Sequence, residues 1–320
     1  MKPKRMIINV LVITLAFLIF TIWYQNNIVK MEQTTASSLK HYKVYLITTD
    51  KQYQYWEFLN KGASDMAAAL GVTYFWDAPT ERNTDKQIAV INKAVDSGAD
   101  ALLVAADDPK FISGVIEDAK ARGVKVIYVD SPANEEAIIT LATDNYEAGT
   151  VAGQTMLSYL DKMGVNSGPI GIVSIRNKHN SELRELGFRN IINADGRFTI
   201  LDTVYTNGDP YVAQGQAERL INNNKDLVGL YGTNEGTSQG VGSAIKASNT
   251  NIVGIGYDKT DKMTELLKGG DLKAIINQNP YTMGYLGMAQ AVAALLGKDT
   301  GPPYINTGIA VIESKNVLVQ

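Results

Sequence analysis

The segment that decides the fold is residues 141–160, LATDNYEAGTVAGQTMLSYL. It leaves an apolar, strand-like run, passes through Asp144 and Asn145, and enters a long stretch with helical character. The small residues at positions 148, 149, 152 and 153 predict a helix that packs closely against a neighbour. A long helix placed within a series of strands favours two separate sheets over one large sheet.

Strand-like and helix-like segments alternate on both sides of residues 141–160. The expected helices carry apolar residues three and four positions apart, as in 59–70, 88–95 and 112–119. The expected strands are 44–48, 72–76, 101–105, 125–129, 138–142, 170–175, 198–205, 227–231, 252–255 and 272–276. Such alternation is typical of parallel sheets with helices on both faces, so we predict an α/β protein with two doubly wound lobes.

The composition is that of a globular protein and excludes several classes of function. Of the 320 residues, 45% are hydrophobic and 20% are charged, and there is no cysteine. This excludes disulfides, zinc–thiolate sites, a cysteine nucleophile and a lipid anchor on cysteine. The net charge of -3 gives no support for nucleic-acid binding, which depends on Lys and Arg side chains that neutralise phosphates.

The N-terminus predicts a membrane anchor. Basic residues precede an uncharged run over residues 6–24, which as a helix approaches the roughly 30 Å hydrocarbon core of a bilayer. These basic residues predict a cytoplasmic N-terminus, with the rest of the chain outside the cell membrane. We expect a stub and single-pass transmembrane helix over 1–24 and a polar tether over 25–41. A cleaved signal peptide is the alternative, since residues 34–36 resemble a cleavage site, although its apolar core is usually shorter.

Polar and aromatic residues gather at the ends of the expected strands, where ligands bind in open α/β sheets. They are Thr48, Thr49, Asp50, Tyr53, Tyr55, Trp56, Asp107, Asp108, Asp130, Ser131, Arg176, Asn177, Lys178, Asn180, Asn234, Glu235, Tyr257, Asp258, Asn277, Gln278 and Asn279. Carboxylates and amides satisfy hydroxyl groups, which both donate and accept hydrogen bonds. Aromatic faces cover the apolar faces of a sugar ring, so this set of residues predicts a sugar site.

Several short segments carry a family resemblance through their order and spacing. They are Thr49 with Tyr55-Trp56 and Gly62-Ala63, Val129-Asp130-Ser131, Thr143-Asp144-Asn145, Arg184 with Gly187-Phe188, Asn234-Glu235, Gly256-Tyr257-Asp258, and Gln278 with Pro280. Together they resemble the ribose-binding family of periplasmic sugar-binding proteins over roughly residues 43–312.

The resemblance implies a type I periplasmic-binding fold, with two α/β lobes, three crossing strands near 143, 278 and 306, and a ligand cleft between the lobes. The N-terminal lobe would comprise 42–143 plus 279–306, and the C-terminal lobe 144–278 plus 307–320. Tyr55, Trp56 and Tyr257 match family aromatics that sandwich the sugar ring. Asp130, Asn234, Asp258 and Gln278 match residues that bind its hydroxyls, and Thr49, Asn180 and Arg184 complete the expected ligand-binding set.

Two departures from the family concern the ligand and the partner. Ala105 and Ser131 stand where ribose binders carry Asn and Arg, which argues against ribose itself but leaves a monosaccharide. A member anchored by a helix instead of a lipid is similar to the sugar-sensing subset found beside membrane histidine kinases, including xylose sensors. We therefore expect a pentose such as xylose as ligand, closure of the lobes on it, and a sensor histidine kinase or an ABC permease as membrane partner.

Other functions have less support. Residues 236–240 fit the G-x-S-x-G hydrolase pattern, but the only histidines, His41 and His179, precede that serine instead of following it. Dinucleotide and phosphate-loop motifs are incomplete, and two distant histidines do not make a metal site, so we expect no catalytic residue, metal or cofactor. A sugar-responsive repressor shares the fold but needs a DNA-binding domain where this chain has its apolar run.

Several site candidates also have purely structural alternatives. Asp130 is compatible with a turn, Asn234 and Asp258 with helix caps, Gln278 with the shape of a crossover, and Tyr257 with a core position. Tyr55 and Trp56 are neighbours on a predicted helix, so we expect at least one of them to face the cleft.

Overall fold

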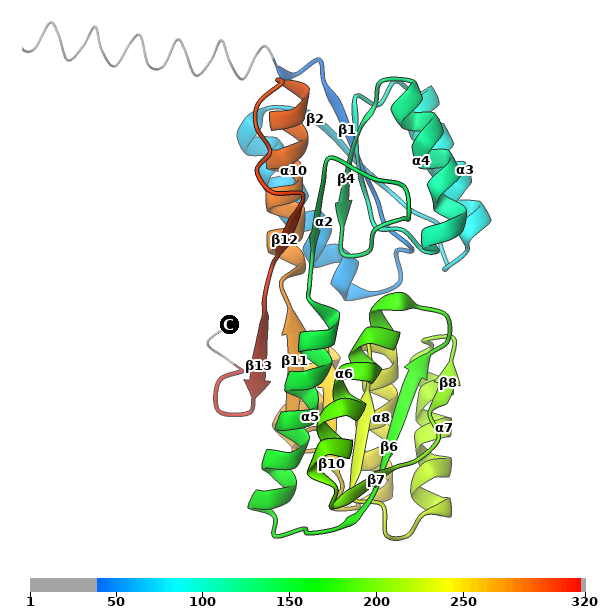
Figure 1. The fold of residues 1–320 in the computed structure, drawn as a ribbon, viewed down its shortest axis with the longest axis vertical. Coiled ribbons are helices and arrows are strands. Elements are labelled where there is room, and N and C mark those ends of the chain that lie inside the picture. The colour runs from blue at the N-terminus through cyan, green and yellow to red at the C-terminus, as the bar shows by residue number, and fades with distance from the viewer. Residues whose placement is uncertain (1–38, 318–320) are drawn as a thin grey trace, which may run out of the picture.

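The computed structural model describes residues 39–317, which form two lobes stacked along the long axis of the molecule (Figure 1). The N-terminal lobe has a six-stranded sheet in the order β12-β5-β4-β3-β1-β2. Its strands are β1 (Lys43–Ile47), β2 (Thr73–Asp77), β3 (Ala101–Val104), β4 (Lys125–Val129), β5 (Ile139–Ala142) and β12 (Tyr304–Asn306). All of these pairings are parallel, so the strands share one carboxyl edge.

The C-terminal lobe has a seven-stranded sheet in the order β13-β11-β10-β9-β6-β7, and β8 also pairs with β6. Its strands are β6 (Gly168–Ile175), β7 (Phe198–Ile200), β8 (Val204–Thr206), β9 (Gly229–Gly232), β10 (Val253–Tyr257), β11 (Ala274–Gln278) and β13 (Ile309–Glu313). Only β13, which lies antiparallel to β11, departs from the parallel pattern within the described part of the chain. The predicted α/β class with two sheets is confirmed.

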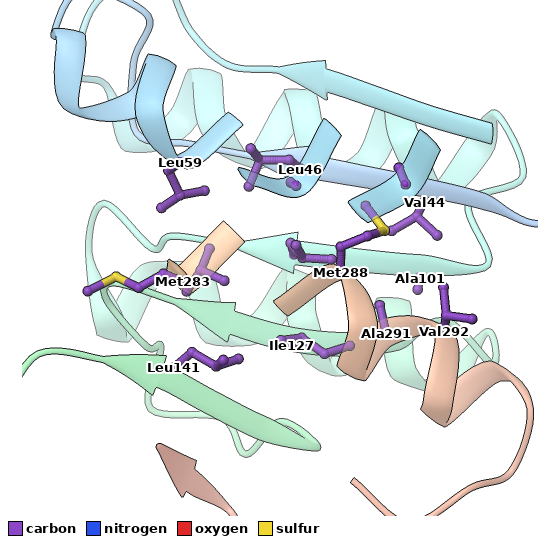
Figure 2. Close-up of a cluster of buried hydrophobic side chains, with 14 of the residues drawn as sticks. Val44, Leu46, Leu59, Ala101, Ile127, Leu141, Met283, Met288, Ala291 and Val292 are labelled. Atoms are coloured by element: carbon purple, nitrogen blue, oxygen red, sulfur yellow. The ribbon is translucent and has the colours of Figure 1, made fainter. Parts of the chain in front are cut away.

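Helices cover both faces of each sheet. The N-terminal lobe has α2 (Gln54–Leu70), α3 (Thr84–Asp96), α4 (Pro109–Ala121) and α10 (Pro280–Leu295). The C-terminal lobe has α5 (Asn145–Lys162), α6 (His179–Asp195), α7 (Pro210–Asn223), α8 (Glu235–Ser248) and α9 (Asp261–Gly269). In the N-terminal lobe, Leu59 of α2 and Met288 of α10 pack with Ile127 of the sheet in one buried cluster (Figure 2). Ile91 of α3 and Ile116 of α4 belong to a second cluster that includes strand residues of the same sheet.

At two of the helix–helix contacts, those of α5 with α6 and of α2 with α10, the backbones lie so close that only glycine fits. A Cβ atom on Gly149 of α5 would lie 2.0 Å from the carbonyl oxygen of Arg184 on α6. The same separation is found between a Cβ on Gly62 of α2 and the carbonyl oxygen of Tyr281 on α10. The close helix packing predicted from the small residues near position 149 is therefore confirmed.

The chain crosses between the lobes in three places. Residues 143–144 join β5 to α5, residue 279 joins β11 to α10, and residues 307–308 join β12 to β13. Each crossing connects a strand or helix of one lobe directly to an element of the other, and the third joins strands of two different sheets.

Some expectations about individual elements differ from the structure. The predicted strand 198–205 is two short strands, β7 and β8, which pair with different parts of β6. The apolar pattern did not predict β12 or β13, because they are short strands at sheet edges with few buried residues, although the resemblance implied a crossing strand near 306. The expected transmembrane helix lies outside the described residues. Within 39–317, no helix is long and apolar enough to cross a membrane.

Candidate functional site

A pocket lies between the two lobes, where the carboxyl ends of the strands of both sheets meet. Every residue that was expected to bind a ligand lines this pocket except Tyr257. The expected residues in the lining are Thr49, Tyr55, Trp56, Asp130, Asn180, Arg184, Asn234, Asp258 and Gln278. Tyr53, Arg82, Asp107, Lys178 and Glu235 also line it.

Asp130 and Asp258 occupy equivalent places in the two lobes. Each directly follows a central strand, β4 or β10, and each has a positive φ of 66°. This left-handed conformation is costly for residues other than glycine, although Asp and Asn tolerate it best. Such strain persists where the surroundings impose it and is common at functional sites. Both carboxyl groups are buried, with 7% exposure for Asp130 and 6% for Asp258.

Gln278 holds Asp258 on the C-terminal side of the pocket. Gln278 Nε2 donates a hydrogen bond of 2.9 Å to Asp258 Oδ1. The other amide atom, Gln278 Oε1, is buried and has no hydrogen-bond partner within residues 39–317. Burial raises the pKa of Asp258 to about 6, although the Arg184 guanidinium and the bond from Gln278 oppose this. A buried acceptor without a partner suits a ligand that brings hydroxyl donors.

Arg184, on α6, forms the floor of this side of the pocket. Its Nε donates a bond of 2.8 Å to Asn145 Oδ1, and its Nη1 donates a bond of 3.0 Å to the carbonyl oxygen of Thr233. The guanidinium carbon lies 3.7 Å from the centroid of the Tyr257 ring. The side chain is therefore fixed from three directions, and its positive charge acts on the carboxyl group of Asp258.

Tyr257 is in the core, contrary to the expectation that it stacks on a ligand. It is the last residue of β10, is fully buried, and belongs to the cluster that includes Ala148 and Phe188. β10 continues two residues beyond the predicted end at 255. Because side chains alternate along a strand, Tyr257 packs beneath the guanidinium of Arg184, and the next residue turns into the pocket.

Tyr55 and Trp56 both line the pocket and pack their rings in the core, and each donates a hydrogen bond to a buried carboxylate. Tyr55 Oη donates a bond of 2.6 Å to Asp130 Oδ1, and Trp56 Nε1 donates a bond of 3.3 Å to Asp50 Oδ2. Burial and the Asp130 carboxylate hold the pKa of Tyr55 well above its ordinary value, so its hydroxyl remains a donor. At least one of these two neighbouring helix residues was expected to face the cleft. Both of them line it, and both are also buried.

The remaining expected residues make hydrogen bonds of their own. Asn234 is the N-cap of α8, and its Oδ1 accepts a bond of 3.2 Å from the N–H of Thr237, so the capping alternative is confirmed for this residue. Asp258 does not cap the following helix, because the N-cap of α9 is Thr260. Thr49 Oγ1 donates a bond of 2.9 Å to the carboxylate of Asp50.

Among the charged residues that complete the pocket, Arg82 was missed by sequence reasoning, and Asp107, Lys178 and Glu235 were noted at strand ends but left out of the expected ligand-binding set. Lys178 Nζ donates a bond of 2.6 Å to Asp107 Oδ1 across the cleft. Arg82 Nε donates a bond of 3.0 Å to Asp50 Oδ2. The strand-end position was a signal for Lys178 and for Glu235, whereas Arg82 lies in the loop after β2 without any such signal.

These groups suit a neutral ligand with many hydroxyls. Lys178 and Arg82 are each paired with a carboxylate, whereas one guanidinium, that of Arg184, and three carboxyl groups, those of Asp130, Asp258 and Glu235, take part in none of the ion pairs of the described residues. A negatively charged ligand would therefore be disfavoured by the surrounding carboxylates. Within residues 39–317, no group of His, Asp and Glu side chains is arranged to hold a metal ion.

Comparison with known proteins decides the family. A model of the periplasmic binding protein domain matches residues 44–299, which include most of both lobes. The chain belongs to the periplasmic binding protein family. The family resemblance seen in the sequence is therefore confirmed.

Relatives match this periplasmic binding protein over most of its length. The ribose import binding protein of Bacillus subtilis is 25% identical over 266 residues, which are 83% of this chain and 85% of the relative. The xylose/arabinose-binding protein of Sulfolobus acidocaldarius is 24% identical over 276 residues, or 80% of this chain and 67% of the relative. An ABC transporter solute binding protein from Agrobacterium vitis, solved with bound D-fucose, has a TM-score of 0.80 at 27% identity. That likeness covers 86% of this chain and 96% of the solved one.

We expect Arg184→Lys to destabilise this periplasmic binding protein without changing its charge. A lysine ammonium cannot bond to Asn145 and to the Thr233 carbonyl while also covering the Tyr257 ring. The free energy of unfolding should fall by about 2 kcal/mol, as measured by urea denaturation. Arg122→Lys, on an exposed arginine, is the control and should cost less than about 0.5 kcal/mol. If both substitutions lowered the free energy of unfolding by the same amount, the stabilising role of the Arg184 contacts would be contradicted.

Proposed function

We propose that this periplasmic binding protein binds a monosaccharide reversibly in the pocket between its lobes, without covalent chemistry. The observation that carries the proposal is the convergence of Asp130 and Asp258, two buried carboxyl groups from equivalent places in the two sheets, with Asn234 and Gln278. Carboxylates and amides satisfy sugar hydroxyls in pairs, and hydrogen bonds to charged groups contribute roughly 1.5–3 kcal/mol each. The relatives named for ribose and for xylose or arabinose support a sugar as the ligand class.

A bound sugar would contact both lobes and so favour their closure. A ligand shifts such an equilibrium by its differential affinity for the closed arrangement. Two hydrogen bonds across the cleft support this interpretation. One joins Asn180 Nδ2 to Asp130 Oδ2 at 3.3 Å, and the other joins Lys178 to Asp107.

We further propose that the binding lobes lie outside the cell membrane, anchored by residues 6–24, and that the closed form signals to a membrane partner such as a sensor histidine kinase. The apolar run and the absence of cysteine favour this arrangement over a lipid anchor. The alternative is the substrate-binding component of a sugar ABC transporter, which the relatives named for sugar import favour. A kinase gene beside this gene would favour sensing, and a permease gene would favour transport.

The ligand we propose is a pentose such as xylose, and a thermal-shift screen of the full-length chain tests this. The panel is xylose, ribose, arabinose, glucose and galactose. A sugar present at 100 times its dissociation constant should stabilise the fold by about 2.7 kcal/mol, which raises Tm by about 5 °C. A larger shift with a hexose would reject the pentose assignment, and no shift with any sugar would reject a monosaccharide ligand.

A further inference from the structure

The first turn of α2 lacks a capping side chain of its own. Its N-cap residue, Tyr53, makes no side-chain hydrogen bond to the helix, although the first N–H groups of any helix need partners. One of them, the N–H of Tyr55, donates a bond of 3.2 Å to Glu235 Oε2. Glu235 is the first residue of α8 in the opposite lobe and is 5% exposed. A carboxylate from the C-terminal lobe thus caps a helix of the N-terminal lobe.

Two further contacts bring the C-terminal lobe to the same turn of α2. Tyr53 Oη donates a bond of 3.0 Å to the carbonyl oxygen of Gly208, in the loop before α7. Gln54 exchanges two bonds with Asp261 at the start of α9: its Oε1 accepts at 3.0 Å from the Asp261 N–H, and its Nε2 donates at 3.4 Å to Oδ2. Three segments of the C-terminal lobe, the loop before α7 and the starts of α8 and α9, therefore contact residues 53–55 of the N-terminal lobe.

We propose that Glu235 is a positioning residue that latches the closed state, because it caps α2 only when the lobes meet and thereby makes closure sensitive to pH. The inference rests on the proposed function in so far as closure accompanies ligand binding. An acceptor at a helix N-terminus interacts favourably with the unpaired N–H groups and with the helix dipole. Separation of the lobes would leave the first turn of α2 without this partner.

Burial and the charged groups around Glu235 together set the direction of the pH effect. Four side chains face this region: Asp50 from the end of β1, its partner Arg82, Tyr53 at the start of α2, and Asp258 from the end of β10. In addition, Gln239 of α8 donates a hydrogen bond of 3.1 Å to Glu235 Oε1. Burial, and then the charge of Asp258, raise the pKa of Glu235 to about 7, although the N–H groups of α2 oppose this.

The direction of the pH effect follows from the difference in the pKa of Glu235 between the closed and the open state. With the lobes apart, Glu235 would no longer be buried against α2, so its pKa would lie closer to its ordinary value of 4.5. Because its pKa is higher when the lobes are closed, closure takes up a proton. The closed state is favoured at acidic pH and loses that advantage as the pH rises through about 7. Asp258, with a pKa of about 6, contributes mainly below about pH 6.5, so Glu235 dominates the change between about pH 6.5 and 8.

The test is the distance between the lobes in the full-length, sugar-free protein, measured by energy transfer between dyes at Glu117→Cys on α4 and Arg219→Cys on α7. Both positions are exposed, and the natural chain has no cysteine to compete for label. The closed-to-open ratio should fall about fourfold between about pH 6.5 and 8. Glu235→Gln, which keeps the acceptor but not the charge, should reduce this change to less than about twofold. Glu182→Gln, at an exposed glutamate in the first turn of α6, is the matched control and should retain the full change.

Glu235→Ala removes the acceptor that Glu235→Gln keeps, so its closed fraction should be lower than that of Glu235→Gln at both pH values. A pH response that is the same in the wild type and in Glu235→Gln, or equal closed fractions in Glu235→Ala and Glu235→Gln, would overturn the latch. These measurements contain no sugar, so they separate the two proposals. If no sugar binds but the pH response depends on Glu235, the latch stands and the monosaccharide proposal fails.

Discussion

Asp258→Asn should abolish most of the sugar affinity while leaving the fold intact. Asn tolerates the left-handed backbone that position 258 requires, with φ of 66°, whereas Ala would add strain. The substitution turns charge-assisted hydrogen bonds into neutral ones, and we expect the dissociation constant to rise about 50-fold. Isothermal titration with the sugar found by the thermal-shift screen measures this, and Asp202→Asn, on an exposed aspartate, is the control.

The same variant should be more stable than the wild type without ligand. Burial raises the folded-state pKa of Asp258 to about 6, so this group favours the folded state at low pH and loses its contribution as the pH rises through about 6. At about pH 7 the wild type carries a buried charge that the amide of the variant lacks, so we expect a gain of about 1–2 kcal/mol in the variant. Loss of both affinity and stability would show instead that Asp258 supports the fold.

Gly284→Ala should produce the largest loss of stability. A Cβ at Gly284 on α10 would lie 2.0 Å from the carbonyl oxygen of Leu59 on α2, and backbone atoms cannot move aside without separating the two helices. We expect the free energy of unfolding to fall by about 3 kcal/mol or more, as measured by urea denaturation. Separation of these helices would also disturb the pocket, because Gln278 lies just before α10 and Tyr55 lies in the first turn of α2.

The control is Gly114→Ala on α4, where an added Cβ meets nothing within 4 Å. Alanine has a higher helix propensity than glycine, so this change should stabilise the protein by about 0.5–1 kcal/mol. A similar loss at both positions would mean that the close contact with α2 does not determine the result at Gly284.

The parts of the fold that the sequence predicted well are those encoded locally. Alternating apolar patterns indicated both sheets, because each buried strand and each amphipathic helix carries its own period. Strand ends indicated Asp130 and Asp258, because parallel sheets bring their carboxyl ends to one edge. One strand was predicted over residues 198–205 because their composition does not reveal that residues 201–203 leave the sheet between β7 and β8.

The parts that escaped prediction depend on exact register or on how the lobes meet. An extension of β10 by two residues decides that Tyr257 packs in the core, and boundaries of this kind are poorly encoded in the sequence. Arg82 and Lys178 acquire their roles from carboxylates that are distant in sequence. Glu235 was visible as a strand-end acid, but its contact with α2 exists only because the two lobes come together.

The three crossings between the lobes also affect how the chain folds as it is made. Met288 and Val292 of α10 complete a core whose other members come mainly from residues before 142, and β12 adds an edge strand after residue 303. The N-terminal lobe therefore cannot finish folding until nearly the whole chain has left the ribosome, whereas most of the C-terminal lobe, from α5 to β11, is contiguous. The later part of the chain should acquire native structure first, against the usual order in which N-terminal domains lead during synthesis.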